Sequence, residues 1–183
     1  MADMNTRDRF NSRYFGPRGI IEGIRLCMAN EHTASALGLI CAAVESMAFL
    51  GLPEDRDTLH DFDFVNWANT YLKPHRLGID GRDLWMIRCA LLNQRVPQRR
   101  VNTDGRPRET LFAWGGYLIY SAMELRPGSR WHRIMMIHAD ELYKAIFSGA
   151  EEFCGGHISN PENARLVSKR LNQVFGQMAD RSN

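Results

Sequence analysis

One arginine in this chain occupies a position that is otherwise typical of buried side chains. Leu84, Ile87 and Leu91 recur with the spacing of an amphipathic helix. Arg88 lies inside the same apolar stripe, one turn after Leu84. A guanidinium group stays charged at physiological pH, and removing it from water is costly unless it is paired. Arg88 is therefore predicted to bind a partner side chain, or to lie at a ligand site or subunit interface.

Two interpretations of Arg88 are open at this stage. In the structural one, the guanidinium caps a backbone carbonyl or pairs with a carboxylate such as Glu45 or Asp83. In the functional one, it contacts a phosphate group or a second subunit. The neighbouring Cys89 is interpreted as a core residue, because no histidine lies near it in sequence to activate the thiol.

Positive charge gathers directly after this helix. Five arginines fall between residues 95 and 108, namely Arg95, Arg99, Arg100, Arg106 and Arg108. In one interpretation they form a positively charged surface beside Arg88 that binds the phosphates of RNA or a nucleotide. In the other they belong to a solvated hairpin. No aromatic residue is interleaved with them, so a base-stacking surface is not predicted.

The stretch from Ile87 to Gln94, in a helix that follows a helical hairpin and a third helix, resembles the HEPN superfamily (higher eukaryote and prokaryote nucleotide-binding domains). Members carry an arginine that is followed a few residues later by a histidine. The matching positions here are Arg88 and Asn93. The resemblance implies a helical bundle and a homodimer paired through the motif helices. It also implies an RNA or nucleotide site, for which the candidate residues are Arg88, Asn93, Arg95, Arg99 and Arg100.

Asn93 stands where family members that cleave RNA have histidine. Histidine transfers a proton near neutral pH, whereas an amide has no titratable group there. The resemblance therefore implies a non-catalytic or weakened member that binds RNA or a nucleotide. From the residues alone, Asn93 also suits a helix C-cap ahead of Pro97.

Two other functions stay open. The first is an active endoribonuclease of a toxin or defence type, whose base is another residue such as His75 or His138. The second is a structural or partner-binding helical module without enzymatic activity, in which Arg88 is a member of a buried ion pair.

Length and composition indicate a single soluble domain over residues 1–183, with 44% hydrophobic and 24% charged residues. The net charge of +2 is too small to indicate wholesale nucleic-acid binding. The cysteines lack metal-ligand spacing, so free thiols in a reducing compartment are expected. The N-terminus lacks a signal-peptide pattern, and the most apolar segment is too polar to span a bilayer. We therefore expect a cytoplasmic protein without a metal or cofactor and without membrane contact.

Apolar spacing predicts a mainly α-helical antiparallel bundle of four to six helices. A hairpin of two helices is expected over residues 17–30 and 33–50, followed by a third helix, the Arg88 helix and two helices after residue 139. Residues 1–16 are polar and are expected to be a loosely ordered lead-in. Turn residues at Thr103-Asp104-Gly105 and Pro127-Gly128 predict a small antiparallel sheet, or β-hairpin, inserted over residues 98–137.

Overall fold

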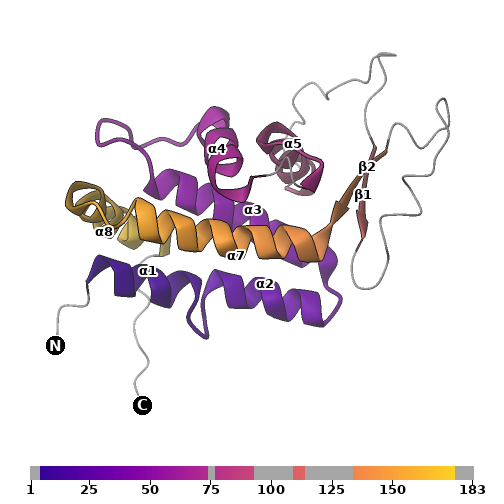
Figure 1. The fold of residues 1–183 in the computed structure, drawn as a ribbon, viewed down its shortest axis with the longest axis horizontal. Coiled ribbons are helices and arrows are strands. Elements are labelled where there is room, and N and C mark those ends of the chain that lie inside the picture. The colour runs from indigo at the N-terminus through magenta and orange to yellow at the C-terminus, as the bar shows by residue number, and fades with distance from the viewer. Residues whose placement is uncertain (1–4, 74–76, 93–108, 114–133, 176–183) are drawn as a thin grey trace.

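The computed structural model describes residues 5–73, 77–92, 109–113 and 134–175. Within these ranges the chain folds mainly into α-helices, as predicted, with one pair of short strands. Helix α3 (Thr33–Leu50) is central to the fold. It contacts α2 (Ile20–Ala29), α4 (Asp61–Trp67), α5 (Gly81–Leu91), α7 (Ala139–Gly156) and α8 (Pro161–Phe175). In Figure 1, α7 crosses in front of α3, with α1 and α2 along one side of it and α4 and α5 along the other.

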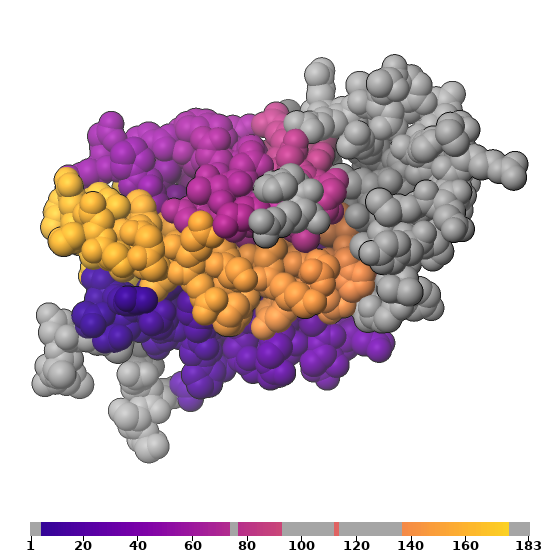
Figure 2. Space-filling view, in the orientation of Figure 1, coloured from indigo at the N-terminus to yellow at the C-terminus, as the bar shows by residue number. Residues whose placement is uncertain are grey.

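Helix α3 is apolar on most of its surface because neighbouring helices cover it from several directions. Leu37, Ile40, Val44 and Met47 are all buried there. Its length and its mean hydropathy of 1.7 would also allow it to cross a membrane, although half of it is buried inside the fold. The space-filling view in Figure 2 shows α7 in the middle of one face, packed against α1 and α2 on one side.

The first described helix is α1 (Thr6–Tyr14), which differs from the expected loosely ordered lead-in. Phe10 and Tyr14 are completely buried, and their rings stack with a centroid distance of 4.2 Å. Phe10 also contacts the ring of Phe153 on α7, and Tyr14 contacts that of Phe175 on α8. These partners lie at the other end of the sequence, so local polarity did not reveal the helix.

Helices α2 and α3 lie within the ranges predicted for the helical hairpin, and the other predicted helices are present in the predicted order. The described part of the chain contains seven α-helices, more than the four to six expected, because α1 was not foreseen. The predicted third helix has two parts. The α-helical turns of α4 continue into a π-helix, η1 (Ala68–Leu72), which ends at Lys73 in a left-handed conformation with φ 47°.

Two strands, β1 (Glu109–Ala113) and β2 (Ile134–His138), pair in parallel with Glu109 opposite Ile134 and Ala113 opposite His138. The predicted antiparallel pairing was therefore wrong. A tight turn joins antiparallel neighbours, whereas parallel neighbours need a long crossover, and residues 114–133 connect these two strands. Both predicted turns, at residues 103–105 and 127–128, lie outside the described residues. Helix α7 follows β2 directly, so the strand pair sits at the end of α7 (Figure 1).

Candidate functional site

The helix that carries Arg88 has a well-defined beginning. Asp80 is its N-cap and accepts hydrogen bonds from the backbone N–H groups of Arg82 and Asp83, both at 2.9 Å. The Asp83 carboxylate accepts in return from the N–H of Asp80 at 3.0 Å, which completes a capping box. Asp83 therefore caps its own helix, and the structure does not assign it as the carboxylate partner of Arg88.

A close approach of backbone fixes this helix against the preceding one. The N–H of Gly81 donates to the Asn69 side-chain oxygen at 2.8 Å. A side-chain carbon at Gly81 would lie only 2.5 Å from the Val65 carbonyl oxygen, so glycine is required for this distance. The N-terminus of α5 is thereby held on α4 and η1, and Arg88 emerges two turns later, facing α3.

Arg88 forms a forked ion pair with Glu45 of α3. Its Nη2 lies 2.8 Å and 2.9 Å from the two carboxylate oxygens, and its Nε lies 3.1 Å from one of them. The Arg88 side chain is 8% exposed and that of Glu45 is 34% exposed. This is one of the two carboxylate partners that the sequence suggested, and a planar guanidinium is suited to such two-point contact.

The surroundings of the pair are largely aromatic and apolar. The guanidinium carbon of Arg88 lies 4.9 Å from the centroid of the Trp85 ring, one turn earlier on α5. Burial raises the pKa of the nearby Cys41 thiol to about 12, although the positive charge of Arg88 acts in the opposite direction. Cys41 is therefore a neutral core thiol, and Cys89 is buried as predicted.

Glu45 is the more exposed member of the pair. That carboxylate lines an open hollow of about 350 Å³ beside α3, together with Ala42, Ser46 and Phe49. A phosphate group that approached from this side would meet the carboxylate before the guanidinium, and like charges repel. The arrangement can hold α3 and α5 together, and an anion that entered through this hollow would have to compete with Glu45 for the guanidinium.

The remaining residues predicted for this site are not placed by the structure. Asn93, Arg95, Arg99 and Arg100 lie outside the described residues, as does His75. His138 is described, at the end of β2, where its Nδ1 lies 3.4 Å from the Asp140 carboxylate. No group of three or more His, Cys, Asp or Glu side chains in the described ranges is arranged to hold a metal ion.

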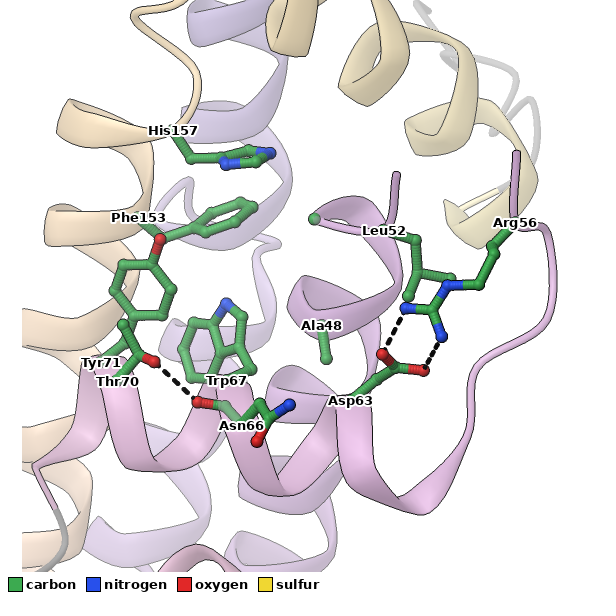
Figure 3. Close-up of a pocket in the computed structure, with 11 residues that line it drawn as sticks. Ala48, Leu52, Arg56, Asp63, Asn66, Trp67, Thr70, Tyr71, Phe153 and His157 are labelled. Atoms are coloured by element: carbon green, nitrogen blue, oxygen red, sulfur yellow. Dashed lines mark hydrogen bonds and ion pairs between the residues drawn. The ribbon is translucent and has the colours of Figure 1, made fainter. Parts of the chain in front are cut away.

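A second site was not foreseen from the sequence. A hollow of about 220 Å³ lies between the C-terminal ends of α3 and α7 on one side and α4 and η1 on the other (Figure 3). Trp67 and Phe153 line it, and both side chains also belong to the hydrophobic core. The signal that could have drawn attention is compositional, because Asn66, Trp67, Thr70 and Tyr71 place aromatic and polar side chains on adjacent turns.

Comparisons of the chain with protein-family models, with curated proteins and with solved structures gave no match.

Proposed function

We propose that this chain is a HEPN-like helical module that acts by binding a partner and not by catalysis, and in which Arg88 has a structural role. The observation that carries this proposal is the forked ion pair of Arg88 with Glu45. It gives the buried guanidinium a carboxylate from within the same fold. This is the partner-binding alternative that the sequence left open.

Burial supports the same role. A buried arginine that lost its carboxylate would be left with an uncompensated charge, which is strongly unfavourable. Trp85 also covers the guanidinium, so a ligand would have to disrupt two contacts at once to use it. An arginine that serves as a phosphate ligand is more useful when its donors point into an open cleft, as in electrostatically focused binding sites.

A second copy of the chain is the partner that the resemblance implies. HEPN-like domains pair through the helices that carry the motif, which here is α5, and α3 packs against α5. Exposed apolar side chains lie on both helices, with Ala42 exposed on α3 and Leu92 48% exposed at the end of α5. Such side chains are suited to an interface between copies.

Incubation of the purified protein with a mixed single-stranded RNA pool tests the proposal. We expect no cleavage, and RNA binding that is the same for the natural chain and for an Arg88→Ala variant whose folding is matched by circular dichroism. Cleavage that disappears in the variant would instead identify a ribonuclease and would reopen the search for its proton-transfer group. Arg88-dependent binding without cleavage would support phosphate recognition.

A further inference from the structure

The hollow beside Trp67 contains an unused hydrogen-bond donor. Trp67 is only 6% exposed, and its indole Nε1 is buried without a hydrogen-bond partner among the described residues. In Figure 3 the nitrogen edge of the indole faces the space between the Phe153 and His157 rings and the end of α3. A buried indole N–H normally finds an acceptor, and leaving it unpaired costs free energy. Within the described part of the chain the donor therefore lacks an acceptor, which a molecule bound in this hollow could supply.

Four aromatic side chains line the hollow, namely Trp67, Tyr71, Phe153 and His157. The rings of Phe153 and His157 stack with a centroid distance of 4.9 Å, and that of Tyr71 meets Phe153 edge-on at 5.5 Å. Gly51 and Leu52, at the end of α3, also line the hollow. Flat, polarizable walls favour a flat molecule, because aromatic rings gain most from stacked or edge-on contact. The volume of about 220 Å³ lies below the roughly 300–1,000 Å³ of drug-sized sites, so the molecule must be small.

The charges at the rim cancel. Arg56 and Asp63 form a two-point ion pair, with N–O distances of 2.5 Å and 3.2 Å. Burial, and to a lesser extent Arg170, lowers the pKa of His157 below its usual range, so its ring is neutral at physiological pH. With no net charge offered by these groups, the hollow favours an uncharged molecule over an anion or a cation.

The backbone around the hollow is unusual. Trp67 is followed directly by the π-helix η1, which carries Thr70 and Tyr71 to the rim and ends at Lys73 with φ 47°. Single π-turns are less stable than α-helix and are found disproportionately at functional sites. The close packing of η1 on α7 holds this geometry, because a side chain at Gly149 would lie 3.0 Å from the Tyr71 carbonyl oxygen.

We propose that this hollow binds a small, planar, uncharged molecule of about one ring that carries a carbonyl oxygen, and that the oxygen accepts a hydrogen bond from the Trp67 indole N–H. The aromatic walls hold the ring, and the indole selects the acceptor. This binding site is independent of the role proposed for Arg88, which lies on another helix.

Titration of the ¹⁵N-labelled protein with benzamide tests the proposal, because benzamide combines one ring with a carbonyl acceptor. The indole N–H resonances of the tryptophans are followed, and the resonance that is lost in a Trp67→Phe variant is assigned to Trp67. We expect benzamide to shift this resonance downfield in a saturable manner at millimolar concentration. Benzene, which has the ring but no acceptor, should not reproduce the downfield shift.

Variants separate the hydrogen bond from the shape of the hollow. Trp67→Phe should weaken benzamide binding about fivefold, the value of one neutral hydrogen bond, while keeping an aromatic wall. Gly51→Ala keeps the N–H but places a methyl group 3.3 Å from the Phe153 ring, so it should also weaken binding. Trp85→Phe, outside the hollow, should leave binding unchanged. The proposal is overturned if the Trp67 resonance does not shift, if benzene and benzamide act alike, or if Trp67→Phe binds benzamide as well as the natural chain.

Discussion

Arg88 on α5 and Glu45 on α3 are 43 positions apart in the chain, and their side chains meet as a two-point ion pair with a shortest N–O distance of 2.8 Å. The contact joins the central helix of the fold to the helix that carries the motif. Arg88 is almost fully buried in this contact, whereas a third of the Glu45 side chain is exposed. The contribution of this ion pair to the free energy of unfolding is therefore expected to be larger than that of a surface ion pair and smaller than that of a fully buried one.

Replacement of Arg88 should destabilise the fold. We expect Arg88→Ala to lower the free energy of unfolding by about 1–3 kcal/mol, because it leaves a partly buried carboxylate without its counter-ion. Arg88→Lys should recover only part of this loss, since an ammonium group cannot form the fork. Urea denaturation gives the values. Arg82→Ala on the same helix is the control, because the Arg82–Asp61 pair is more than 40% exposed on both sides and should matter by less than about 0.5 kcal/mol. Equal losses in Arg88→Ala and Arg82→Ala would contradict the assigned role.

Arg170, on the last described helix, should contribute strongly to the stability of the fold. Its guanidinium is buried and donates to the carbonyl oxygens of Leu52, Pro53 and Arg56, in the loop that follows α3. Arg170→Met removes these donors, and we expect a loss of about 2–4 kcal/mol in the free energy of unfolding. Arg165→Met on the same helix is the matched control, because its ion pair is exposed. A loss no greater than that of the control would show that water replaces the lost donors.

The stability of the fold should depend on His157 below neutral pH. Burial, followed by Arg170, lowers the pKa of His157 in the folded chain below its usual value of 6.5. The unfolded chain therefore binds the proton more readily, so this contribution is complete above about pH 6.5 and is lost as the pH falls toward the folded pKa. When the pH is lowered from 7.5 to about 5, the melting temperature of His157→Gln should fall by less than that of the natural chain. His32→Gln, at an exposed position, should behave like the natural chain. An unchanged pH dependence in His157→Gln would contradict this assignment.

If the chain pairs with itself through α3 and α5, Leu92→Asp should dissociate the dimer. A charge placed at a buried apolar contact is unfavourable, and Leu92 is exposed in the single chain. Sedimentation velocity distinguishes dimer from monomer. Leu26→Asp is the control, because Leu26 is similarly exposed at 47% but lies on α2. A natural chain that sediments as a monomer, or equal effects of the two variants, would exclude this interface.

Most helices of this fold could be predicted from local spacing. The stripes of α2, α3, α5, α7 and α8 follow the helical period, and Gly and Pro residues mark several of their ends. Helix α1 could not be predicted in this way, because only Phe10 and Tyr14 are apolar on its buried face. Both side chains pack against residues of α7 and α8, which are distant in the sequence. The direction of the strand pair also depends on a long connection, which alternation within each strand does not encode.

The candidate sites were predictable to different extents. The place of Arg88 in an apolar stripe indicated that it needs a partner, but the choice between Glu45 and Asp83 depends on how α3 and α5 pack. The hollow beside Trp67 could not be predicted, because an unpaired indole N–H is a property of the folded surroundings. Apolar spacing within α4 is compatible with the burial of Trp67. It carries no information about whether a buried polar atom is satisfied.

The affinity of a Glu45→Gln variant for single-stranded RNA, measured beside the natural chain, tests the structural role of Arg88 most directly. Glutamine removes the negative charge that shields Arg88 while keeping the shape of the side chain. Glu152→Gln on α7, whose partner Lys73 is exposed, controls for the change in net charge. If Arg88 is structural, Glu45→Gln should bind RNA no better than Glu152→Gln. If Glu45→Gln instead binds RNA with tenfold or higher affinity, and adding Arg88→Met abolishes this gain, Arg88 is a phosphate ligand that Glu45 blocks in the natural chain.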